Sequence, residues 1–182
     1  MRNWMQRCAR LLRHRWAEGS MQAAVPDELL DRLGRRVAAS EQRHTGEIRI
    51  CVEAGLPLSY VWRDASARER AVALFGKLRV WDTEHNNGVL IYLLLADHAI
   101  EIITDRGLTR VIPTDTWDKL AQEMGTAFHD GHYEDGLTQA LAYVTALLHQ
   151  HFATDPDAAP VSDIDELPDA PVRLRAGQRP QS

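Results

Sequence analysis

Residues Val89-Leu90-Ile91-Tyr92-Leu93-Leu94-Leu95-Ala96 form the longest apolar run in the chain, and they decide its fold class. A helix needs about 20 apolar residues to cross a bilayer, so this run is too short to span one and has the length of a strand. Its apolar residues do not alternate with polar ones, which is typical of a central strand covered on both faces. We therefore expect residues 88–96 to form a buried strand at the centre of a sheet.

The segments on either side predict the neighbours of this strand. Residues 48–53 alternate between apolar and more polar side chains, which predicts a half-buried strand. Ser66 and Glu69 then have the spacing of a capping box at the start of a helix. A strand, a helix and a strand in this order form a right-handed parallel crossover. Residues 99–104 follow after so short a break that they can pair only antiparallel.

Three more amphipathic patterns predict helices around this sheet. One covers residues 26–44, and two lie after the last strand at residues 114–128 and 133–150. The predicted order is αβαββαα, with helices on both faces of a small mixed sheet. This is an α/β/α sandwich in one domain, residues 22–152.

Residues 1–19 differ from the rest of the chain in charge. They hold five Arg and one Glu, a net charge of +4 in a chain whose net charge is −5. Trp4, Leu12 and Trp16 lie on one stripe of a helical pattern, which predicts a basic amphipathic helix over residues 1–19. Such a helix packs on its own domain or on a partner protein, or it lies on an anionic membrane surface. In each case we expect the stripe to be hidden against protein or lipid.

The C-terminal stretch, residues 153–182, shows no apolar periodicity. It holds six acidic side chains and three Arg, and it is rich in Pro and Ala. Such a composition cannot bury enough apolar surface to fold, so it predicts an acidic disordered tail.

Composition excludes several classes of function. The net charge of −5 argues against a nucleic-acid-binding protein, which needs a basic face. Two cysteines are too few for a disulfide framework, and arginines interrupt every candidate signal peptide. The chain has no nucleophile elbow, P-loop or dinucleotide turn. We expect a cytoplasmic protein, bound peripherally at the inner membrane face if its first helix meets lipid.

The predicted antiparallel pair brings two polar loops to one edge of the sheet. Residues 81–88 precede the central strand, and residues 105–107 follow its neighbour. Together these loops supply the oxygen donors that Ca²⁺ and Mg²⁺ prefer: Asp82, Glu84, Asn86, Asn87 and Asp105. Two interpretations stay open. The side chains form a weak Ca²⁺ or Mg²⁺ site, or they are ordinary turn residues whose charge Arg79 or Arg106 offsets.

Three motifs in order resemble the TPM-domain family, named after the TLP18.3, Psb32 and MOLO-1 proteins. They are Asn87-Gly88-Val89-Leu90-Ile91-Tyr92-Leu93-Leu94, Ile102-Ile103-Thr104-Asp105-Arg106-Gly107-Leu108 and Phe128-His129-Asp130-Gly131-His132-Tyr133-Glu134-Asp135-Gly136-Leu137. The resemblance covers roughly residues 26–150 and implies an α/β/α sandwich. It also implies roles found among family members, which include acid phosphatases, proteins that bind divalent cations, and proteins that act in photosystem repair or receptor assembly. The chain departs from the family at Asp105-Arg106-Gly107-Leu108, where Gly-Tyr-Gly-Leu is frequent, and it lacks the Asp-x-Ala-Gly segment before the first helix.

These observations predict a TPM-like binding or assembly module that a weakly bound divalent cation modulates. Its partner is a protein or a membrane surface, reached through the N-terminal helix. The alternative is a metal-dependent phosphatase that uses Asp82, Glu84 and Asp105 to hold the ion and activate water. An enzyme requires these acids to converge around an open coordination position, whereas a module presents an apolar surface.

Overall fold

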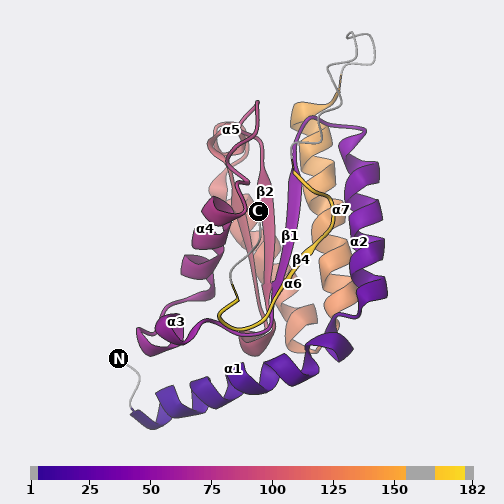
Figure 1. Ribbon diagram of the computed structural model, residues 1–182. Coiled ribbons are helices and arrows are strands. Elements are labelled where there is room, and N and C mark those ends of the chain that lie inside the picture. The colour runs from indigo at the N-terminus through magenta and orange to yellow at the C-terminus, as the bar shows by residue number, and fades with distance from the viewer. Residues whose placement is uncertain (1–3, 155–166, 179–182) are drawn as a thin grey trace.

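The computed structural model describes residues 4–154 and 167–178, with side chains from residue 8 onward. Four strands form one mixed sheet in the order β3-β2-β1-β4. The strands are β1 (Ile48–Glu53), β2 (Val89–Leu94), β3 (Ala99–Thr104) and β4 (Val172–Leu174). The predicted α/β fold with helices on both faces of a mixed sheet is confirmed (Figure 1).

Helices cover both faces of the sheet and one of its ends (Figure 1). They are α1 (Trp4–Ala24), α2 (Asp27–Glu41), α3 (Leu58–Trp62), α4 (Ala67–Lys77), the 3₁₀ turn η1 (Leu95–Asp97), α5 (Arg106–Thr109), α6 (Thr114–His129) and α7 (Tyr133–Phe152). The predicted order omitted α3, α5 and β4, which have five, four and three residues. Elements this short contain too few residues to show a periodicity. The predicted capping box at Ser66 and Glu69 is present at the start of α4.

The central position predicted for β2 is confirmed. All six of its residues are 0% exposed. It pairs in parallel with β1, Ile48 opposite Val89, and antiparallel with β3, where Val89 lies opposite Thr104. One core lies between the sheet and α2, α6 and α7, and the other lies between the sheet and α4. An apolar run without alternation supplies both cores, because successive strand residues face opposite sides.

The prediction that β1 is half-buried is wrong. All six of its residues are buried, including Arg49 and Glu53. Glu53 accepts hydrogen bonds from the Arg70 guanidinium of α4, at 2.6 and 2.9 Å, and from the Tyr92 hydroxyl at 2.7 Å. A buried charge is tolerated when it is paired and hydrogen-bonded, so these partners allow a polar residue in an interior strand.

The prediction of a disordered tail is wrong for residues 167–178. Within them β4 pairs in parallel with β1, with Val172 opposite Cys51. Leu167 and Leu174 are 5% and 1% exposed and belong to the core under α4. The prediction relied on the average composition of residues 153–182. That average does not show that two of these residues are leucines able to pack into the core. Residues 155–166 and 179–182 of the predicted tail lie outside the described residues.

The N-terminal helix forms, but it is longer than predicted and packs by another face. It continues through Gly19 to Ala24 and runs across the end of the sheet at which β1 and β2 finish (Figure 1). Leu12 and Trp16 of its apolar stripe do not pack on the domain, because they are 63% and 81% exposed, and their contact with lipid or a partner protein stays a prediction. The side chain of Trp4 lies outside the described residues. Within the described part of the chain, no helix is long and apolar enough to cross a membrane.

Candidate functional site

A cluster of charged side chains fixes α1 to the domain. Arg10 is 6% exposed, and its guanidinium bonds to Asp97 Oδ2 at 3.0 Å and to the Ala65 carbonyl oxygen at 2.8 Å. The same guanidinium lies 3.0 Å from Asp64 Oδ1, and Arg13 also pairs with Asp97. Since Asp64 and Ala65 follow α3 and Asp97 follows β2, α1 is tied to the end of α3 and to the end of the central strand.

His14 joins this cluster to the loop after β1. Its Nδ1 accepts a hydrogen bond from the Leu56 backbone N–H at 3.0 Å, so its Nε2 carries the proton and faces Asp97 Oδ1 at 3.3 Å. Burial alone would raise the pKa of Asp97, but hydrogen bonds from His14 and Arg10 outweigh it and hold that pKa below its usual value. Asp97 is therefore a stable anion that holds three side chains of α1.

Close backbone contact reinforces this attachment. A Cβ atom added at Gly55 would lie 2.5 Å from the His14 carbonyl oxygen. The helix therefore approaches the loop after β1 as closely as a residue without a side chain permits.

The opposite face of α1 is open. Leu12 and Trp16 project from it, and Arg13 and Arg15 beside them are 55% and 67% exposed. The neighbouring helix α3 carries two more exposed apolar side chains, Leu58 at 65% and Trp62 at 63%. We call Leu12 and Trp16 the apolar face. Together with Leu58 and Trp62 they are four of the eight large apolar side chains found exposed in the described residues.

The two polar loops do meet at the other end of the sheet, as predicted. The Gly107 N–H donates to the Asn86 carbonyl oxygen at 2.8 Å, and the Asp105 N–H donates to the Gly88 carbonyl oxygen at 2.9 Å. These bonds bring Asn86, Asn87 and Asp105 to one place, which we call the polar edge.

Two oxygens of the polar edge are buried without a hydrogen-bond partner. Asn87 is 0% exposed and donates through Nδ2 to the Thr45 carbonyl oxygen at 2.9 Å, while its Oδ1 makes no bond. Asp105 is 8% exposed, and its Oδ1 caps α5 by accepting from the Arg106 N–H at 2.6 Å, while its Oδ2 has no hydrogen-bond partner. Such oxygens are uncommon, because leaving a buried acceptor unpaired costs about 1–3 kcal/mol.

The other predicted ligands are exposed or already have a partner. Asp82 and Glu84 are exposed, and Asp82 lies 3.9 Å from Arg79, which offsets its charge. Asn86 Oδ1 accepts from Arg106 Nε at 2.8 Å. Within residues 4–154 and 167–178, no three His, Cys, Asp or Glu side chains are grouped so that they could hold a metal ion.

A family model described as the TPM domain matches residues 21–147. The chain belongs to the TPM domain family. The recognition made from three motifs is therefore confirmed. Residues 4–20 of α1, which carry Leu12 and Trp16, and the β4 segment lie outside the matched TPM domain.

Two solved structures resemble this TPM protein. The BA42 protein of the psychrophilic bacterium Bizionia argentinensis is 27% identical with a TM-score of 0.65, over 80% of this chain and 92% of that one. An N-terminal domain of a protein from P. gingivalis is 21% identical with a TM-score of 0.52, over 64% and 71% of the two chains, and it shows the fold alone. A search of curated proteins found no match.

The sequence reasoning missed the residues that orient α1 on the TPM domain. Arg10, His14 and Ala17 recur at helical spacing and form a face of their own, but two of them are polar. Because helices are expected to bury their apolar stripe, a face with two polar residues is predicted to be exposed to solvent. Only the presence of Asp97, which is distant in sequence, reverses that assignment.

Proposed function

We propose that this TPM protein is a binding module that docks on an anionic membrane surface through the outer face of α1. One observation carries the proposal: Leu12 and Trp16 stay 63% and 81% exposed although the helix is firmly attached. Burying such side chains is worth roughly 1.5–3 kcal/mol each. The isolated protein does not gain this free energy, so it is available to a partner.

Charge favours a lipid surface as that partner. Residues 1–19 have a net charge of +4, whereas the whole chain has a net charge of −5. An anionic surface therefore attracts α1 and repels the acidic remainder, which turns the apolar face toward the lipid. Trp16 suits this position, because tryptophan is enriched at membrane–water interfaces.

Co-sedimentation with phosphatidylglycerol-containing vesicles tests the proposal. The wild-type chain should bind these vesicles, and the double variant Leu12→Ser/Trp16→Ser should bind at least about tenfold less, since a loss of about 1.4 kcal/mol already has that effect. Binding should weaken as salt rises from about 0.1 to about 1 M, because the Debye length falls from about 10 to about 3 Å.

A matched variant controls for general loss of apolar surface. Trp81 and Val111 are each 49% exposed and lie outside α1 and α3. Trp81→Ser/Val111→Ser should bind vesicles as the wild type does. Absence of wild-type binding to anionic vesicles would overturn the proposal, as would equal binding by the two double variants.

The polar edge supports a second candidate function, the binding of a divalent cation that modulates the module. The supporting observation is the pair of buried oxygens without hydrogen-bond partners, Asn87 Oδ1 and Asp105 Oδ2. Both are the hard oxygen donors that Ca²⁺ and Mg²⁺ prefer. An ion there would be held by Asn87 and Asp105, with Asp82, Glu84 and Asn86 close enough in sequence to contribute by loop rearrangement.

Titration of the intact chain with Ca²⁺ or Mg²⁺ tests this second candidate. Amide shifts of residues 82–88 and 104–107 should move together at millimolar ion, and the melting temperature should rise. Asp105→Asn should abolish both responses, while Asp115→Asn, an exposed change on α6, should leave them intact. Unchanged shifts would leave the polar edge as a set of turn residues.

The phosphatase alternative depends on the same edge. Its acids should converge around an open position, but Asp82 and Glu84 are exposed and only Asp105 is buried. We therefore place it behind the binding module. Hydrolysis of a phosphate monoester that requires Mg²⁺ and is lost in Asp105→Asn would reverse this order.

A further inference from the structure

The C-terminal segment, residues 167–178, lies beside β1 and α2, and its residues Val172–Leu174 form β4 (Figure 1). We propose that the surface under it is a recognition site for an extended peptide of another protein. The peptide would have two leucines seven positions apart, with an arginine directly before the second, as in Leu167, Arg173 and Leu174. This surface is separate from the apolar face, so the inference does not depend on membrane docking.

The site binds the backbone of its occupant. β4 adds a parallel strand to β1, and the Ala54 N–H donates to the Leu174 carbonyl oxygen at 3.0 Å. Arg49 donates to the carbonyl oxygens of Pro168 and Ala170, the latter at 2.8 Å. Any extended peptide offers such groups, and adding a strand to a sheet edge is a common mode of peptide recognition.

Three side chains provide selectivity. Leu167 and Leu174 enter the core under α4 and are 5% and 1% exposed. Arg173 donates to Asp27 Oδ1 at 2.5 Å and to the Val25 carbonyl oxygen at 2.6 Å, at the junction of α1 and α2. Acceptors arranged in this way favour a guanidinium, which has several donors in a fixed plane.

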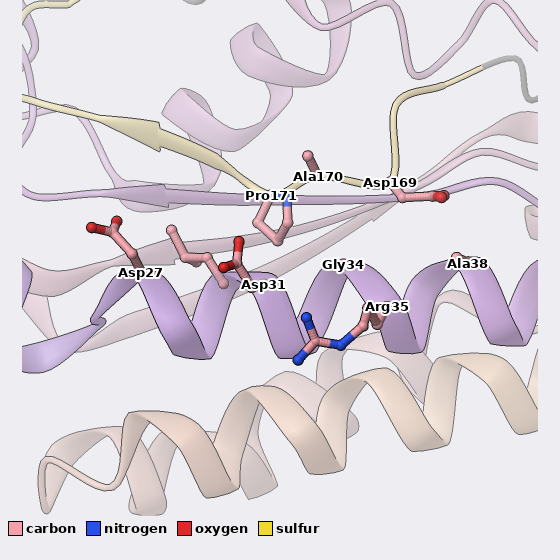
Figure 2. A pocket seen from close by; sticks show the side chains of 9 residues that line it. Asp27, Asp31, Gly34, Arg35, Ala38, Asp169, Ala170 and Pro171 are labelled. Atoms are coloured by element: carbon pink, nitrogen blue, oxygen red, sulfur yellow. The ribbon is translucent and has the colours of Figure 1, made fainter.

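The C-terminal segment leaves part of the site unfilled. A pocket of about 550 Å³ lies between α2 and residues 169–171. Asp31, Gly34 and Ala38 line it on the helix (Figure 2). The chain passes close to Gly34, where an added Cβ would lie 3.4 Å from Pro171 Cδ. A partner peptide therefore has room between its backbone and α2 for contacts that residues 169–171 of this segment do not make.

The surface lies within the matched TPM domain, and its occupant does not. β1 and α2 lie within the matched TPM domain, residues 21–147, whereas the C-terminal segment lies outside it. Only three residues of the segment form ladder pairs. Because it is covalently attached, the segment competes with a free peptide at a high effective concentration. It therefore holds the site closed until a better occupant displaces it.

Peptide binding to the full-length chain tests the inference. The variant Arg173→Glu/Leu174→Asp weakens the attached competitor, so a fluorescent peptide of residues 167–178 should bind it at least tenfold more tightly than it binds the wild type. The same peptide carrying both changes is the control and should bind neither protein. A variant that keeps its thermal transition but binds no better than the wild type overturns the proposal.

Hydrogen exchange of the unmodified chain supplies a test that requires no variant. The Ala54 N–H, bonded to Leu174, should exchange at least a hundredfold faster than the Ile91 N–H of β2, at a rate independent of mild denaturant. Equal rates would show that the segment leaves only on global unfolding and would overturn the proposal. A wild-type dimer with exchanged segments would overturn it too, because the occupant would then be a second copy.

Discussion

The imidazole of His14 accepts a hydrogen bond from the backbone N–H of Leu56 at 3.0 Å, which joins α1 to the loop after β1. The two residues are 42 positions apart. His14 presents Nε2 to Asp97 at the same time, so one side chain links the helix to the C-terminal ends of both strands of the parallel pair. This link explains why α1 is held with its outer face turned away from the domain.

The contact beside this bond should be intolerant of a side chain. In Gly55→Ala the new Cβ would meet the His14 carbonyl oxygen at 2.5 Å, so α1 should detach while the sheet remains folded. Trypsin should then cleave after Arg10 and Arg13 at least tenfold faster. Gly76→Ala is the control, because a Cβ there meets nothing within 4 Å, and it should stabilise α4 by roughly 0.5–1 kcal/mol. Unchanged proteolysis of Gly55→Ala would contradict the close contact.

Removing the anion at the centre of the cluster should be costly. Asp97→Asn leaves the buried Arg10 without a full countercharge and should lower the free energy of unfolding by at least about 2 kcal/mol. Asp115→Asn removes an ion pair with Lys119 that is more than half exposed, so the free energy of unfolding should stay close to the wild-type value. Denaturant unfolding measures both. Similar losses in the two variants would show that the Asp97 cluster does not stabilise the fold.

The Glu53–Arg70 pair should show strong coupling. Both side chains are at most 2% exposed, so Arg70→Met alone should cost about 3–5 kcal/mol by leaving Glu53 as an unpaired buried anion. The double variant Glu53→Gln/Arg70→Met should recover part of that loss. A double-mutant cycle measures the coupling free energy, and additive effects would contradict a direct pair.

Stability should depend on pH through Glu41, which lies beneath the C-terminal segment. Burial, with a hydrogen bond to Asp169, raises the pKa of Glu41 to about 10. A raised folded-state pKa means that this contribution is fully present below the unfolded value of 4.5 and is lost as pH rises through about 10. Glu41→Gln, which needs no proton, should therefore gain at least about 1 kcal/mol over the wild type at pH 8 but not at pH 4.

An exposed glutamate provides the comparison for this pH series. Glu123→Gln on α6 should follow the wild type at both pH values. Thermal melting across the series measures the difference. If Glu41→Gln and the wild type show the same pH dependence, the carboxyl is not protonated in the folded chain.

Part of the polar edge could be predicted from the sequence, and part could not. The short break after β2 forced an antiparallel neighbour, which placed Asn87 and Asp105 near each other. Whether a loop side chain turns inward depends on its partners, however. Asn87 is drawn inside by Thr45, from a different loop, whereas Asp82 stays outside beside Arg79.

The spacing of apolar residues along the sequence determined the layers of this protein, because that spacing shows which side chains of a strand or helix are buried. The run Val89–Ala96 specified the central strand, and the segments around it specified the two faces of helices. Tertiary structure alone decided which face of α1 is buried and where residues 167–178 lie. The physical reason is that a buried or fixed charge needs a partner, and the partner here is distant in sequence. Arg10 can be buried because Asp97 neutralises its charge. Arg173 is held in place because Asp27 accepts a hydrogen bond from it.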